Sequence, residues 1–213
     1  MIDIATQIGA IDRTVLRRRR DDGAEEVAVV ATRTYDADAA DVWDALTDPE
    51  RLVRWFLPVR GDLHEGGTFQ LEGNAGGQIL RCRQASLLRV TFGTETSVVE
   101  LRLTPTDGRT VHELEHTVPI EMAQSGAGAM WVGPGWDGAL MGLGLYLDGD
   151  VVEDPVAAAS SPEVVAFNEV SVRSWAATVE ASGTATAEQL AEAVQVSLAQ
   201  FAPGAADEAS PAG

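Results

Sequence analysis

Between residues 59 and 118, apolar and polar side chains alternate with a period of two, which is typical of strands with one buried face. Turns rich in glycine, asparagine and aspartate divide this region, as short hairpin connections require. Strands linked by hairpins predict an antiparallel meander. Five strands are predicted, in the segments GTFQLEG (67–73), GGQILRCRQ (76–84), LLRVTFG (87–93), SVVELRLTP (97–105) and RTVHELEHTV (109–118).

Strand and helix patterns flank the meander on both sides. The segment EEVAVVATRTY (25–35) is rich in β-branched residues and predicts one more strand. Before it, isoleucine and valine at helical spacing predict a short helix over residues 3–16. After it, DVWDALTDPERLVRWF (41–56) predicts two short helices, because Asp48-Pro49 ends one and begins the next. Longer helical patterns follow within residues 136–147, 160–183 and 184–201.

The charge of the chain argues against several classes of partner. The 213 residues include fifteen arginines, no lysine and a formal net charge of -18. A nucleic-acid partner needs a basic patch, so we expect none. Residues 1–20 lack the order of a signal peptide, and no apolar run reaches the length of a membrane span. The single cysteine, Cys82, excludes an intrachain disulfide and fits a reducing compartment, so we expect a cytoplasmic protein.

The pentapeptide HELEH, His112 to His116, matches a zinc-binding pattern letter for letter. On a helix this pattern places two histidines on one face, with the glutamate as general base. The Thr-Val pairs on both sides of it favour a strand instead. In a strand the two histidine Cα atoms would lie about 13 Å apart, which is too far for one zinc ion to bridge. We therefore expect no metal site here.

The alternation also predicts which way these histidines face. In SVVELRLTP the apolar residues Val99, Leu101 and Leu103 share one face, and the register turns Leu114 toward the same side. His112 and His116 share the parity of Leu114, so both imidazoles should face inward. They could bond to a ligand oxygen or act as a weak general acid or base. Alternatively, backbone carbonyls or hydroxyl groups of the protein satisfy them, or they lie at the open end of the sheet.

Several stretches, in their order and spacing, resemble a known family. They are VWDALTDPERLVRWFLPVRGDL, GGTFQLEGNAGGQI, LEHT and GPGWDGALMGLGLYL. They are similar to the bacterial branch of START-like (SRPBCC) proteins related to the activator of heat-shock-protein-90 ATPase, over about residues 25 to 148. The resemblance implies an α+β helix-grip fold, a curved antiparallel sheet around a long C-terminal helix with a cavity between them. Family members bind apolar small molecules, assist chaperones or have no assigned activity, and they share no catalytic residue set.

The expected organisation adds helices at both ends of this domain. We predict an N-terminal helical extension over residues 1–23, the START-like domain over 24–149 and a C-terminal helical hairpin over 161–202. A tail rich in small residues, 203–213, should be disordered. Both a monomer and a homodimer are compatible with the sequence.

The leading hypothesis is a protein that binds a small, largely apolar ligand between the sheet and residues 136–147. We expect a binding protein rather than an enzyme and assign no catalytic residue, cofactor or metal. Two alternatives stay open: a chaperone-associated interaction module of the heat-shock-protein-90-activator type, and a cyclase- or hydrolase-type enzyme using the same cavity. The predicted ligand-binding residues are Trp55, Phe69, Leu101, His112, Leu114, His116, Trp136, Leu140 and Leu143.

Overall fold

The computed structural model describes residues 2–20, 22–150 and 153–203 of the chain. The predicted disordered tail therefore lies outside the described residues, except for its first residue. The chain forms two compact units that are interleaved along the sequence. The first unit comprises Met1–Ala31, Pro119–Gly138 and Ala159–Gly213, and the second comprises Thr32–Val118 and Ala139–Ala158. The boundaries predicted at 23, 149 and 161 stay predictions.

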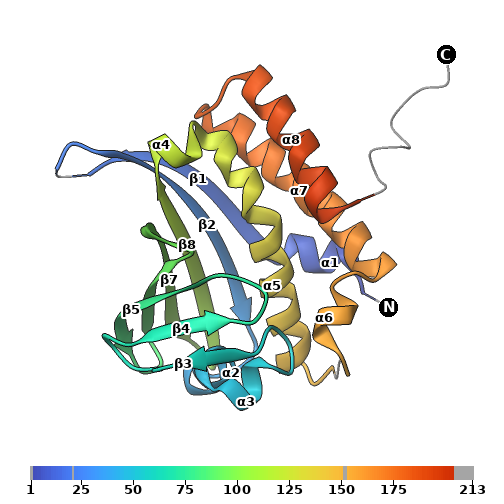
Figure 1. Cartoon of the computed structure of the whole chain (residues 1–213). Helices are drawn as coiled ribbons and strands as arrows, with labels where there is room; N and C mark the ends of the chain where they lie inside the picture. Colours follow the sequence, from blue (N-terminus) through green and yellow to red (C-terminus); the bar gives the residue numbers. More distant parts are fainter. Residues whose placement is uncertain (1, 21, 151–152, 204–213) are drawn as a thin grey trace. The chain divides into compact units, whose positions relative to one another are not determined.

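Eight strands form an antiparallel, curved sheet with the hydrogen-bonded order β1-β2-β8-β7-β6-β5-β4-β3 (Figure 1). The strand predicted over 25–35 and the five strands of the meander are confirmed, since all six segments contain strands close to the expected bounds. The strands are β1 (Ile11–Arg19), β2 (Glu25–Tyr35), β3 (Val59–Gly61), β4 (Thr68–Leu71), β5 (Gly76–Arg83), β6 (Leu87–Phe92), β7 (Thr94–Thr106) and β8 (Arg109–Pro119).

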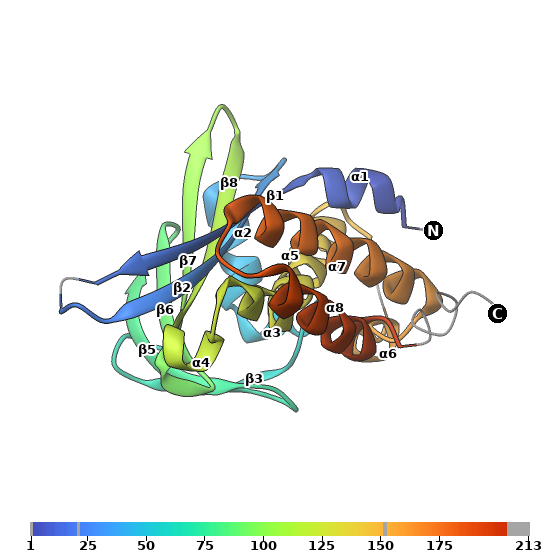
Figure 2. The ribbon, with the colours of Figure 1, turned by 90° about the horizontal axis from the view of Figure 1, so that it is seen from above.

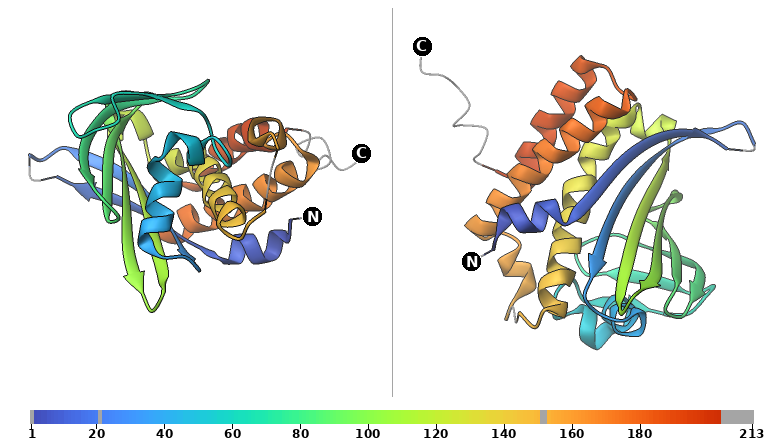
Figure 3. Two further views of the ribbon diagram at one scale, coloured as in Figure 1. Left: turned by 90° about the horizontal axis from the view of Figure 1, so that it is seen from below. Right: turned by 180° about the vertical axis from the view of Figure 1, so that it is seen from behind.

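The helix predicted over residues 3–16 is wrong beyond Gly9. Helix α1 covers only Ile4–Gly9, with Asp3 as its cap, and strand β1 begins at Ile11. Ile11 and Val15 are both buried. A spacing of four residues fits a helical period of 3.6 and is also a multiple of two, so it could not separate the two structures. Pairing with β2, which lies beside β1 (Figure 3), decides for the strand.

Three short helices and the end of a longer one belong to the second unit. Helix α2 (Ala39–Thr47) ends at Asp48, whose side chain then caps α3 (Pro49–Leu52), so the predicted break is confirmed. The second unit also holds α6 (Pro155–Ala158) and the last turns of α5 (Gly133–Leu147). The α+β helix-grip architecture is thereby confirmed.

The first unit is built largely from helices. It contains α4 (Ile120–Ala123), the 3-10 helix η1 (Gly126–Trp131), α7 (Pro162–Ser182) and α8 (Ala187–Phe201). The last two lie side by side (Figure 2), which confirms the C-terminal helical hairpin. The hydroxyl of Thr186 and the side chain of Gln189 cap α8 reciprocally. In the part of the chain that the structure describes, no helix is both long enough and apolar enough to span a membrane.

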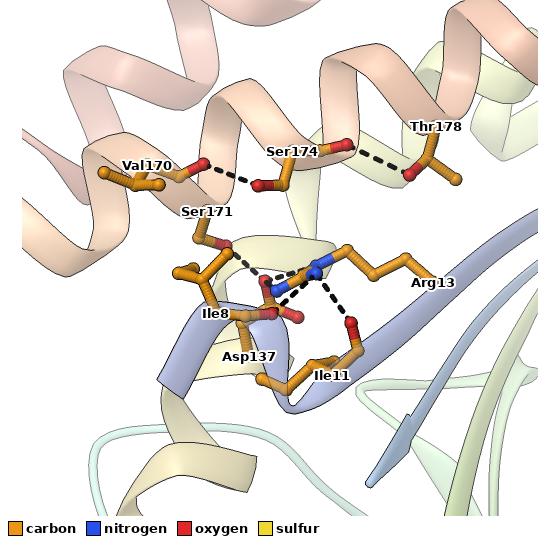
Figure 4. Close-up of polar contacts among 8 residues, drawn as sticks. All are labelled: Ile8, Ile11, Arg13, Asp137, Val170, Ser171, Ser174 and Thr178. Atoms are coloured by element: carbon orange, nitrogen blue, oxygen red, sulfur yellow. Dashed lines mark hydrogen bonds and ion pairs between the residues drawn. The ribbon is translucent and has the colours of Figure 1, made fainter. Parts of the chain in front are cut away.

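A buried ion pair joins three elements of the first unit (Figure 4). The Arg13 side chain from β1 donates from Nε to the carboxylate of Asp137 at 2.8 Å, and Ser171 of α7 donates to the same oxygen. Arg13 also donates to the backbone carbonyls of Ile8 and Ile11. Burial raises the pKa of Asp137, and the charge of Arg13 opposes that rise. The fold thus surrounds one buried guanidinium with three acceptor groups, a carboxylate and two backbone carbonyls.

Candidate functional site

HELEH lies in strand β8, and its three alternate side chains face inward as predicted. His112, Leu114 and His116 are 1%, 3% and 4% exposed. Across the ladder they stand opposite Leu103, Leu101 and Val99 of β7. We call the buried side of β7 and β8 that these residues define the inward face. The extended backbone separates the two imidazoles. Among the described residues, no group of three or more His, Cys, Asp and Glu side chains could hold a metal ion.

His112 is a buried imidazole that finds no hydrogen-bond partner among the described residues. Neither Nδ1 nor Nε2 has one within the described parts of the chain, and both atoms are inaccessible to solvent. Its ring centroid lies 6.0 Å from that of Tyr35. Burial lowers the pKa of His112 to about 4, so the ring is neutral at physiological pH. A neutral imidazole carries one donor and one acceptor, and here both are unused.

His116 occupies a second cluster with a partner of its own. Its Nε2 lies 2.8 Å from the hydroxyl of Ser97. Its ring meets the Phe92 ring edge-on at 5.8 Å, and Phe92 in turn lies 6.5 Å from Phe69. Burial lowers the pKa of His116 to about 4 as well. Two of the predicted residues, Phe69 and His116, are therefore linked through Phe92, and His116 has a hydrogen-bond partner in Ser97.

Arg33 and Tyr35, on β2, were not predicted to belong to the site. Arg33 is only 7% exposed, and its guanidinium carbon lies 5.4 Å from the centre of the Tyr35 ring. Its Nε and Nη1 have no hydrogen-bond partner among the described residues. A signal was present in the sequence: both residues have the parity of Val27, Val29 and Ala31, the buried apolar side of the strand. An arginine at such a position is informative because buried charges are normally paired.

Helix α5 approaches the sheet closely in the second unit. The Tyr35 hydroxyl donates to the carbonyl oxygen of Leu140 at 3.0 Å, and burial raises the pKa of that phenol. One turn further on, a Cβ on Gly144 would lie 2.5 Å from Nη2 of Arg33. The absence of a side chain at Gly144 therefore lets the guanidinium reach the helix. Leu143 is fully buried in the same stretch.

The other predicted residues are distributed unevenly. Trp55 is half-buried and lies against Gly142 of α5, but its indole N–H already donates to the carbonyl of Ala45 at 3.0 Å. Leu101 is half-buried in β7 opposite Leu114. Trp136 belongs to the first unit, so its role in the site stays a prediction. The second unit thus brings together Arg33, Tyr35, His112 and the Leu140–Gly144 turns of α5. Chemically, this cluster offers a permanent cation and a neutral imidazole in apolar surroundings.

Comparison with known proteins agrees with the geometry. The fold defines the protein as an α+β helix-grip protein of the START-like class. The family model described as "Activator of Hsp90 ATPase homolog 1-like protein" matches residues 36–148, and the chain belongs to this family. That match runs from the residue after β2 to just past the end of α5, and it includes His112 but not Arg33 or Tyr35.

Solved structures extend the likeness beyond the family match. The crystal structure of CalU16 from Micromonospora echinospora is 37% identical, covers 80% of this chain and 99% of its own, and gives a TM-score of 0.65. Its solution structure gives 38%, 81%, 97% and 0.67. EF2215 from Enterococcus faecalis, a conserved protein of unknown function, is 16% identical over 79% of this chain and 91% of its own, with a TM-score of 0.56, and supports the fold alone. A search of curated proteins finds no match.

Proposed function

We propose that the protein binds a small, largely apolar molecule in its second unit, between the inward face and the Leu140–Gly144 turns of α5. The observation that carries this proposal is the state of His112, whose two ring nitrogens are buried and unpartnered among the described residues. Leaving a buried polar group unsatisfied costs about 1–3 kcal/mol. A ligand with a polar atom at this point would recover that free energy. The apolar body of the ligand would exchange its contacts with water for contacts with the protein.

The same residue favours binding over catalysis. A general acid or base works best when its pKa lies near the operating pH. Burial holds the pKa of His112 at about 4, so the ring is a poor base near neutrality and a good neutral hydrogen-bonding group. The chaperone-associated role stays a prediction that rests on the family resemblance.

The test is native mass spectrometry on protein purified from its own host. We expect the native protein to have a larger mass than the polypeptide alone. Denaturation should release the difference as a small molecule. The variant His112→Phe keeps an aromatic ring but removes both nitrogens. A smaller fraction of this variant than of the wild type should carry the bound molecule. His64→Phe is the matched control, since His64 is exposed and should leave the bound fraction unchanged. A wild-type protein without any released molecule, and indistinguishable from His112→Phe, would contradict the proposal.

A further inference from the structure

We infer that the ligand of this site carries an anionic oxygen group, such as a carboxylate or an ionised phenol, on its apolar body, and that Arg33 receives this group. The inference rests on the proposed function and specifies the chemical class of the ligand. It follows from three features of Arg33: its missing partners, its fixed position and its neighbours.

The first feature is a buried cation, two of whose nitrogen atoms have no hydrogen-bond acceptor among the described residues. An arginine side chain stays protonated in proteins, so burial cannot neutralise it. A buried charge without a partner is strongly unfavourable. Arg13 in the first unit, whose side chain is 8% exposed, shows how this chain treats a buried guanidinium, with one carboxylate and two carbonyls as acceptors (Figure 4). Nε and Nη1 of Arg33 have no such acceptor among the described residues. The missing acceptor is what a ligand would supply.

The second feature is that the guanidinium is held in place. The Tyr35 ring lies 5.4 Å from its central carbon, and the α5 backbone at Gly144 lies against Nη2. A contact of this kind is a cation–π interaction between the guanidinium and the face of the aromatic ring. It uses none of the N–H donors for a hydrogen bond to oxygen, because those donors lie in the plane of the guanidinium. Arg33 is thus positioned by its surroundings, while Nε and Nη1 stay available for hydrogen bonds to a ligand.

The third feature is the neighbour on the adjacent strand. Strands β2 and β8 are hydrogen-bonded neighbours, and the ring centroids of Tyr35 and His112 are 6.0 Å apart. The Tyr35 ring therefore contacts both Arg33 and His112. A carboxylate accepts two parallel N–H groups from a guanidinium, while the His112 ring can bond to a second polar atom of the same ligand. A neutral ligand could bond to His112 but would leave the charge of Arg33 unmet.

The net charge of the whole chain bears on which anions Arg33 would bind. At -18, the chain repels anions at long range. A small, fully hydrated anion would therefore be disfavoured. Burial of a large apolar body favours binding of an anion that carries one. Such a ligand needs the cation only for its anionic group. The combination selects apolar acids rather than inorganic anions.

The experiment compares two fluorescent probes of one aromatic framework. The first, 8-anilinonaphthalene-1-sulfonate, carries an anionic group that stands in for the acidic oxygens of the ligand, and N-phenyl-1-naphthylamine lacks it. Fluorescence titration gives a Kd for each probe with the wild type, Arg33→Met and Arg33→Gln. We expect the wild type to bind the anionic probe about 10-fold or more tightly than the neutral one, which is the scale of one charge-assisted hydrogen bond. In both variants this ratio should fall to about one or below, with the Kd of the neutral probe little changed.

A stability measurement accompanies the titration. Without ligand, Arg33→Met should unfold at the same temperature as the wild type or higher, because the variant removes an unpaired buried charge. A clear fall in unfolding temperature for both Arg33 variants would indicate a structural role and overturn the inference. So would equal affinity of the wild type for the two probes, or an anionic preference that persists in Arg33→Met. In those cases the proposed function would stand. If the wild type binds neither probe and releases no molecule in the mass spectrometer, the proposed function fails and takes the inference with it.

Discussion

The two buried histidines should make the protein lose stability as the pH falls below neutrality. Each has a pKa of about 4 in the folded protein, compared with 6.5 for a free imidazole. Below pH 6.5 the unfolded chain binds protons that the folded chain does not bind until about pH 4. Proton binding therefore stabilises the unfolded state over this range. The folded state has its full stability relative to the unfolded state only above pH 6.5.

The magnitude follows from the two pKa values. Lowering a pKa from 6.5 to about 4 corresponds to about 3 kcal/mol per histidine once the pH lies below both values. At pH 5, about 2 kcal/mol per histidine is already lost. Solvent screening reduces these figures little, since His112 and His116 are 1% and 4% exposed. Together they should remove about 4 kcal/mol between pH 8 and pH 5, a large part of the stability of an ordinary domain.

Urea denaturation at pH 8 and pH 5, followed by circular dichroism, measures this effect. His112→Phe and His116→Gln should each lose about 2 kcal/mol less than the wild type between the two pH values. Comparing losses, rather than stabilities, cancels the contribution of the many carboxylates. His64→Gln, at an exposed histidine, serves as control for the substitution itself. The glutamine at position 116 keeps a hydrogen-bonding group for Ser97, so that variant changes mainly the titration.

Equal losses in the wild type and in both variants would refute the reasoning. Nuclear magnetic resonance gives a direct check, because the imidazole Cε1 proton shifts when the ring is protonated. A midpoint near pH 6.5 for His112 or His116 in the folded protein would show that the ring is not held neutral by burial.

Three further predictions concern the first unit. Arg13→Met leaves the Asp137 carboxylate buried without its cation and should lower the free energy of unfolding by about 3–5 kcal/mol in urea denaturation; a change below about 1 kcal/mol would contradict the pairing. Gly133→Ala places a Cβ 2.6 Å from the Trp175 indole and should cost about 1–3 kcal/mol, seen as a lower unfolding temperature, whereas an unchanged temperature would show that the indole moves aside freely. Thr186→Ala removes the α8 cap and should cost about 1 kcal/mol in the same assay, and Thr186→Ser should restore most of it.

Much of the fold could be predicted because its signals are local. The period of two located the strands of the meander, and Asp48 followed by Pro49 located the helix break. The N-terminal segment was misassigned because Ile11 and Val15 fit both periods, and only the neighbouring strand separates them.

Within the candidate site, orientation was predictable and partnership was not. His112 and His116 share the parity of Leu114, so their direction followed from the alternation alone. Their similar environments in sequence gave no sign that Ser97 would meet one ring and leave the other without a partner. Arg33 was missed because an arginine in a strand is usually exposed, and its burial depends on what covers it.

The sequence by itself determined the strands of the meander, which side chains of β8 face inward, and that HELEH lies in a strand rather than on a helix, because backbone period and side-chain direction are properties of neighbouring residues. Only the tertiary structure decided that a buried arginine, a tyrosine and an unpartnered histidine lie together beneath α5. These residues come from segments far apart in the chain, and their meeting depends on β2 lying beside β8 and on a helix with glycine at the point of approach. Burial and the supply of hydrogen-bond partners are set by such distant contacts, so the polar character of the site could be read only from the folded chain.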